Sequence, residues 1–66
     1  MKPSNLPDYV ELRVSMVKHE TDDAVLVEYE GEDIWIPKSC LEDYPDVGDG
    51  GDILVQQWIA VEKGMV

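Results

Sequence analysis

The chain has 66 residues, of which fifteen are acidic and five are basic, so its formal net charge is −10 at pH 7. A chain of this length forms one small core and has no room for a second domain or a deep substrate cavity. Nucleic acids and anionic membranes are bound by clusters of lysine and arginine, whereas the basic residues here are spread singly. We therefore expect a single domain over residues 1–66 that binds neither directly.

The cysteine content and the N-terminal segment bear on the cellular compartment. Cys40 is the only cysteine of the sequence, which excludes an intramolecular disulfide and a multi-cysteine zinc site and suits a reducing environment. The segment MKPSNLPD carries one lysine and no apolar run, unlike a signal peptide or a membrane span. We expect a cytoplasmic protein.

The first half of the chain predicts two strands. Two prolines within residues 1–8 predict an irregular N-terminal arm. Apolar and polar residues then alternate, which predicts a strand over residues 9–18 with Met16 on its apolar side. The polar residues 19–23 predict a turn, and residues 24–29, which are rich in β-branched side chains, predict a second strand.

The second half predicts shorter elements. Residues 33–37 predict a third strand, and the S-x-x-E spacing of Ser39 and Glu42 predicts a capping box that opens a helical turn over residues 39–44. The glycine-rich residues 46–51 predict a flexible loop. Further elements are a fourth strand over 53–57 and a closing helical turn over 58–63 that Gly64 ends. The expected fold class is α+β, a small antiparallel sheet of three to four strands with one or two short helical turns.

The turn around Gly31 fixes which side chains share a face of the hairpin. The turn is either Glu30-Gly31 or Gly31-Glu32, and both choices give the same parity. In both, Asp33 lies opposite a glutamate, a like-charge pair that should destabilise a sheet and that folding alone would not favour. The expected core face holds Val25, Val27, Tyr29, Ile34 and Ile36, and the opposite face holds Leu26, Glu28, Glu30, Asp33 and Trp35.

The acidic residues are concentrated in the middle of the chain. Residues 20–52 contain twelve acids and one base, a net charge of −11. These carboxylates form either a solvated face that keeps the protein soluble, or a row that imitates the phosphates of a nucleic acid and attracts a basic cleft. On the second interpretation Trp35 is an apolar anchor. The candidate partner-binding residues are Glu28, Glu30, Glu32, Asp33, Trp35, Asp43, Asp46, Asp49 and Asp52.

The sequence offers little for catalysis or metal binding. Asp46, Asp49 and Asp52 lack the alternating ligand positions and the distal glutamate of a calcium loop. His19 has no second histidine, and Cys40 has no evident base or oxyanion site. We expect no metal, no cofactor and no catalytic residue, and hence a protein that is not an enzyme.

Two segments, TDDAVLVEYEGEDIWIPKS and WIAVEKGMV, resemble a pattern found in small uncharacterised proteins of bacteriophages and other mobile elements. In those chains an A-I/V-L-V-E stretch leads to W-I/L-P-K-S, and the chain closes with W-I/L-A-x-E-K-G-L/M. The resemblance covers roughly residues 21–66 and carries no known catalytic residues. It implies a phage protein acting in the cytoplasm of a bacterial host, where compact acidic proteins include anti-CRISPR inhibitors and other DNA mimics. The acidic DYPDVGDGGD loop departs from the pattern.

Charge and resemblance together give the leading hypothesis: an acidic inhibitor of the anti-CRISPR type, a DNA mimic that occludes a basic DNA-binding surface of a bacterial defence complex. Its partner would be a basic DNA-binding protein such as a CRISPR–Cas subunit, and its role would be evasion of antiviral defence by protein–protein interaction. The alternative is a phage accessory or structural interaction module without inhibitory activity. We expect a monomer rather than a homodimer, although pairing of two copies through an exposed strand edge stays open.

Overall fold

The computed structural model describes residues 8–66, and most of this segment is β-strand. Six strands form two three-stranded antiparallel sheets, one with the order β1-β6-β5 and the other with the order β2-β3-β4. The irregular arm expected over residues 1–8 lies outside the described residues except for Asp8. The elements are β1 (Tyr9–Val14), β2 (Met16–Glu20), β3 (Ala24–Tyr29), β4 (Glu32–Pro37), a 3-10 turn η1 (Lys38–Cys40), β5 (Leu41–Asp43), β6 (Gly51–Gln56) and α1 (Gln57–Glu62).

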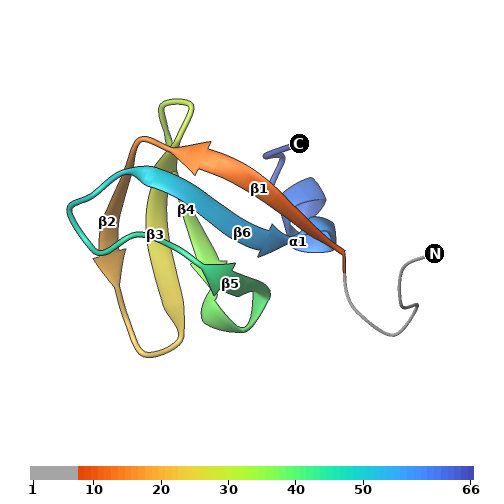
Figure 1. The fold of residues 1–66 in the computed structure, drawn as a ribbon, viewed down its shortest axis with the longest axis horizontal. Coiled ribbons are helices and arrows are strands. Elements are labelled where there is room, and N and C mark those ends of the chain that lie inside the picture. The colour runs from red at the N-terminus through yellow and green to blue at the C-terminus, as the bar shows by residue number, and fades with distance from the viewer. Residues whose placement is uncertain (1–7) are drawn as a thin grey trace.

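The single strand expected over residues 9–18 is two strands that bend at Ser15. The bend carries the chain from one sheet into the other, and Figure 1 shows β6 crossing steeply over β3 and β4. The Ser15 amide donates to the Glu28 carbonyl at 2.8 Å, so this backbone donor keeps a hydrogen bond at the bend. The apolar alternation changes phase here: Val14 and Val17 are buried, whereas Met16, expected on the apolar side, is exposed.

The hairpin of β3 and β4 confirms the predicted pairing. Its turn is Glu30-Gly31, with φ values of 51° and 83°, the pattern of a two-residue hairpin turn that follows the natural twist of the strands. Val27 pairs with Ile34 on the core side. On the other side Asp33 lies opposite a glutamate, as expected, and this glutamate is Glu28.

The prediction of a helical turn over residues 39–44 is wrong. Only residues 38–40 form a 3-10 turn, Ser39 makes no capping bond, and the chain continues as β5. Leu41 pairs with Val55 of β6 and is buried together with Cys40. Tertiary burial of these two side chains therefore outweighs the local capping preference. The fold accordingly contains a strand and a second sheet that the sequence did not predict.

The loop between β5 and β6 lies along the outer edge of β2. The Val17 amide donates to the Asp49 carbonyl at 2.8 Å, and the Gly48 amide donates to the Val17 carbonyl at 2.7 Å. Gly50 then passes the corner so closely that a Cβ there would lie 2.3 Å from the Ser15 carbonyl oxygen. The loop thus closes one side of the molecule with backbone bonds.

The closing helix is confirmed with its bounds shifted by one residue. It covers 57–62 rather than 58–63, and Gly64 follows it with a φ of 75°. The Tyr29 hydroxyl donates to the Met65 carbonyl at 2.9 Å, and this bond joins the segment after α1 to β3. No helix in residues 8–66 is long and apolar enough to cross a membrane.

The core lies between the two sheets and is entirely apolar. No polar or charged side chain of the described residues is buried. Because the core occupies the inner faces, the outer faces of the two sheets point away from each other. The buried side chains are Val14, Val17, Val25, Val27, Ile36, Cys40, Leu41, Ile53, Val55, Ile59, Ala60 and Met65.

Candidate functional site

The nine candidate residues are distributed over four parts of the surface. Only the hairpin brings a larger group of them together, because β3, β4 and their turn carry five of the nine. The outer face of β3 and β4 carries Glu28, Asp33 and Trp35; the hairpin tip carries Glu30 and Glu32; the outer face of the other sheet carries Asp43 and Asp52; and the loop before β6 carries Asp46 and Asp49.

Trp35 lies near the middle of the outer face of the β2-β3-β4 sheet. Leu26 pairs with His19 on one side and with Trp35 on the other, so these three residues form one row across the sheet. The His19 and Trp35 rings contact edge to face, with centroids 6.2 Å apart and planes at 86°. Trp35 remains 43% exposed, which leaves an aromatic surface available beside the acidic residues.

A register shift in β2 positions a lysine against the like-charge pair. The shift falls between Val17, which faces the core, and His19, so Lys18 is the extra residue of a bulge. Its Nζ lies 2.9 Å from Asp33 Oδ1 and 3.9 Å from Glu28 Oε1. The hydrogen bond to Asp33 raises the pKa of Lys18. The predicted opposition of Asp33 and Glu28 is therefore confirmed, but Lys18 compensates it within the fold.

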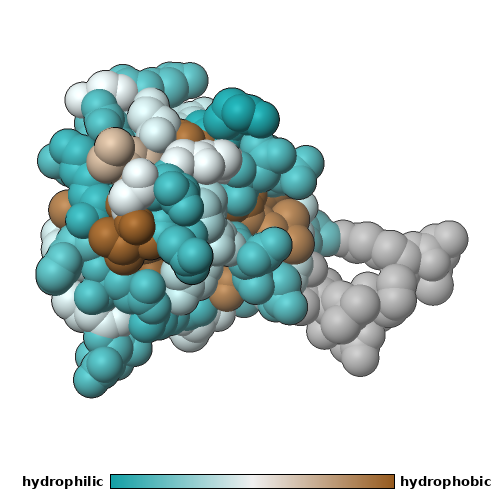
Figure 2. Space-filling model, turned by 60° about the vertical axis from the view of Figure 1, so that its left-hand side comes forward, coloured by the Kyte–Doolittle hydropathy of each residue, from teal (hydrophilic) through white to brown (hydrophobic). Residues whose placement is uncertain are grey.

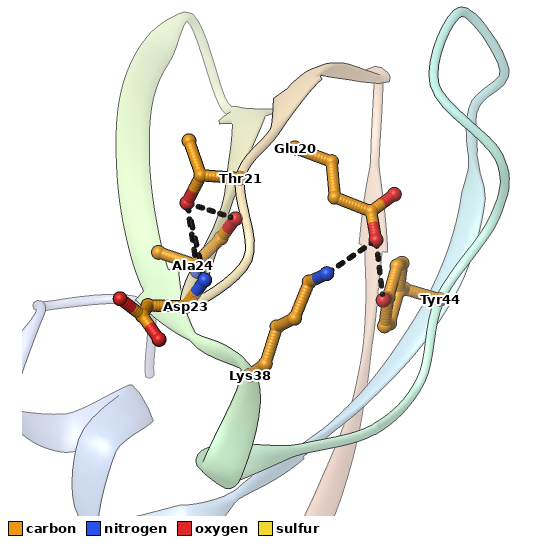
Figure 3. Close-up of polar contacts among 6 residues, drawn as sticks. All are labelled: Glu20, Thr21, Asp23, Ala24, Lys38 and Tyr44. Atoms are coloured by element: carbon orange, nitrogen blue, oxygen red, sulfur yellow. Dashed lines mark hydrogen bonds and ion pairs between the residues drawn. The ribbon is translucent and has the colours of Figure 1, made fainter.

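A second polar cluster joins the two sheets. Figure 3 shows the Lys38 amine and the Tyr44 hydroxyl converging on one oxygen of Glu20. Lys38 Nζ lies 2.6 Å from Glu20 Oε2, and the Tyr44 hydroxyl donates to the same atom at 3.1 Å. We call these three residues the Glu20 cluster. It links β2 to the segments that follow β4 and β5. The contribution of Tyr44 could not be predicted from the sequence, because no local pattern places it beside Glu20.

Contacts within the Glu20 cluster shift the pKa values of its three residues. The hydrogen bond from Lys38 lowers the pKa of Glu20, and the bond to Glu20 raises the pKa of Lys38. Burial, followed by the bond to Glu20, raises the pKa of Tyr44. Glu20 and Lys38 thus stabilise each other as ions, which is a structural role rather than an arrangement for proton transfer.

A shallow pocket of about 470 Å³ opens at the corner between the sheets. Arg13, at its rim, contacts Asp52 at 3.5 Å, and both side chains are largely exposed. Among residues 8–66, no group of three or more histidine, cysteine, aspartate or glutamate residues could hold a metal ion. Cys40 is buried. The pocket is lined by Arg13, Val14, Ser15, Glu30, Gly50 and Gly51.

The face of the molecule that Figure 2 shows is mostly hydrophilic. In the view of Figure 2, hydrophobic residues form small separate patches between polar ones. Large apolar side chains that are exposed come from several parts of the described chain, and two of them, Trp58 and Val61, lie on α1. These exposed apolar side chains are Met16, Trp35, Val47, Trp58, Val61 and Val66.

Comparison of the chain with protein-family models, with curated proteins and with solved structures found no match. Function must therefore be inferred from the residues of this chain and their arrangement.

Proposed function

We propose that this protein acts by binding, and that its acidic hairpin occupies a basic nucleic-acid-binding surface of a partner protein. The observation that carries the proposal is a group of exposed carboxylates that the fold does not neutralise. Three basic residues of the described segment already have acidic partners. Arg13 pairs with Asp52, Lys18 with Glu28 and Asp33, and Lys38 with Glu20. By contrast, Glu30, Glu32, Asp46 and Asp49 are exposed and form no ion pair with the described residues.

The proposed contact surface is the tip of the hairpin together with Trp35 rather than all nine candidates. Glu30 and Glu32 at its tip would meet basic side chains of the partner first, as phosphates do. Trp35 would supply an apolar anchor farther along the same strand pair. Asp43 and Asp52 lie on the outer face of the other sheet, so they would attract the partner only at longer range.

Binding of this kind blocks a partner without chemistry. A rigid carboxylate surface speeds the encounter with a basic cleft, and the bulk of the domain then excludes the nucleic acid. A DNA-binding subunit of a bacterial CRISPR–Cas complex is the particular partner that we propose, on the strength of the resemblance of the W-I-P-K-S and W-I-A-V-E-K-G segments to phage proteins. In that case the protein is an anti-CRISPR inhibitor.

Capture from a bacterial lysate that contains a CRISPR–Cas system tests this function. The tagged protein is incubated with lysate at low and at high salt, and DNA binding by each captured subunit is measured with and without the protein. We expect capture of a DNA-binding subunit that weakens at high salt, and loss of DNA binding by that subunit. Salt-insensitive capture of a phage protein, with no effect on DNA binding, would favour an accessory or structural module instead.

A further inference from the structure

Strand β4 has an unpaired backbone edge. It is the outermost strand of its sheet, and within residues 8–66 only β3 pairs with it. The Lys38 amide donates to the Asp23 carbonyl at 2.8 Å, directly after the Ala24–Pro37 pair. Because bonded and non-bonded pairs alternate in an antiparallel ladder, the backbone groups directed toward β3 and toward the free edge also alternate. Those directed toward the free edge belong to Asp33, Trp35 and Pro37.

The other outer strands differ from β4. The loop amide of Gly48 and the carbonyl of Asp49 already bond to the edge of β2, and β5 has only three residues and an irregular register. Strand β1 carries Glu11 and Arg13, whose charges cancel. Only β4 combines a six-residue edge with a tryptophan that is 43% exposed and an acidic first half.

We propose that the free edge of β4 binds an extended basic segment of a partner protein, which joins the sheet as a fourth strand antiparallel to β4. This inference rests on the proposed function, because it takes the partner to be basic. The amides and the carbonyls of Asp33 and Trp35 would bond to the added strand. Pro37 has no amide hydrogen, so it ends the run of donors.

The side chains next to this edge select basic residues. Asp33 and Trp35 both point to the outer face, so every second residue of the added strand would lie beside them. A lysine or arginine there would pair with Asp33, which carries a second carboxylate oxygen besides the one on Lys18, and would contact the face of Trp35. The alternate residues would face inward beside Ile34, so an apolar residue suits those positions.

A second copy of this chain fits the edge poorly. Each copy carries a charge of −10, and Glu32 and Asp33 lie at the start of the strand. Acidic residues on an edge strand repel an identical strand, whereas they attract a basic one. The charge that protects the edge from self-association is therefore the charge that selects the partner.

A seven-residue peptide of alternating lysine and valine, acetylated and amidated at its ends, is the probe. Its affinity is measured by calorimetry at low salt, against two N-methylated forms of the same peptide. In the proposed register the lysine amides bond to β4 and the valine amides point away. Methylation of the lysine amides should therefore weaken binding at least about tenfold, whereas methylation of the valine amides should change it less than about threefold.

Equal affinity of both methylated peptides would show that charge alone holds the peptide, and would overturn the edge proposal while leaving the acidic contact surface intact. Absence of binding by the parent peptide, or a stable dimer in sedimentation experiments, would also overturn it. Variants of the protein give an independent check. Trp35→Ala and Asp33→Asn should each weaken binding, and Trp58→Ala, which removes an exposed tryptophan on α1, should leave it unchanged.

Discussion

Gly50 is the residue at which the loop before β6 approaches the β1-β2 corner most closely. A Cβ at this position would lie 2.3 Å from the Ser15 carbonyl oxygen and 3.2 Å from the Val14 carbonyl oxygen, and neither is a flexible side-chain end. We expect Gly50→Ala to lower the free energy of unfolding by about 2 kcal/mol, since one strand or the loop must shift. Urea unfolding measures the change.

Gly48→Ala is the matched control for Gly50→Ala. Gly48 has a φ of 96°, but a Cβ there would meet nothing within 4 Å, so its substitution reports backbone strain without a clash. If Gly50→Ala costs no more than Gly48→Ala, the close approach at the corner does not limit the fold.

Glu30 occupies a left-handed conformation that glutamate rarely adopts. Its φ is 51°, and with Gly31 it forms a turn in which asparagine is strongly preferred at the first position. We expect Glu30→Asn to stabilise the protein by about 0.5–1 kcal/mol in thermal or urea unfolding. Glu32→Asn removes the same charge one residue past the turn and should not give this gain; equal gains would show that relief of charge repulsion is the cause.

At the scale of elements, the β3-β4 hairpin could be predicted because its information is local. Period-two alternation and one glycine determine which side chains of two adjacent strands share a face, and Val25, Val27 and Ile36 are buried as expected. The bend at Ser15 could not be predicted, since it depends on a bond to Glu28 in a strand that comes later in the chain. Strand β5 was missed because it has only three residues and pairs with β6 in an irregular register, so it shows no clear alternation.

The Glu20 cluster makes stability depend on pH in a defined direction. Glu20 has a pKa below its ordinary value of 4.5, so its contribution is present above pH 4.5 and is lost as the pH falls through the lower pKa of the folded state. The pKa of Lys38 lies above 10.5, so its contribution is lost as the pH rises through that value. Between these limits Glu20 and Lys38 are both ionised, and their ion pair stabilises the junction of the sheets.

We therefore expect Glu20→Gln to destabilise the protein at pH 7, and the difference from the wild-type protein to shrink as the pH falls below 4.5. Thermal unfolding of both proteins from pH 7 to pH 3 measures this difference. Tyr44→Phe, which removes one hydrogen bond and no negative charge, should destabilise less at pH 7. A difference between Glu20→Gln and the wild-type protein that stays constant across this pH range would contradict the ion-pair role.

At the scale of the whole molecule, repulsion among the acidic residues opposes folding. Fifteen acids and five bases are held in a small domain, and the described ion pairs neutralise only some of the acids. Added sodium chloride screens this repulsion, so we expect the thermal midpoint to rise with salt. A variant with Glu32→Gln, Asp46→Asn and Asp49→Asn should show a smaller rise; an equal or larger rise would show that screening of these charges is not the cause.

The sequence predicted the acidic character of the molecule but not how its acids are grouped. Residues 20–52 cross from one sheet to the other, so Asp33 and Asp43 face opposite directions although they lie close in the chain. The ion pair of Lys18 with Asp33 could not be predicted from the sequence either, because it depends on a bulge in β2. The prediction that Asp33 lies opposite a glutamate on the outer face of the hairpin is confirmed, and the structure shows that this glutamate is Glu28.

The most direct test of the acidic hairpin as the contact surface compares two charge reversals of equal size. One variant carries Glu30→Lys and Glu32→Lys at the hairpin tip, and the other carries Asp46→Lys and Asp49→Lys in the loop, so both have the same net charge. Release of DNA from the captured partner is then measured for each folded variant. We predict that the hairpin variant loses most of its inhibition and that the loop variant retains most of it. Equal inhibition by the two variants would contradict the assignment, because net charge rather than the hairpin would then determine binding.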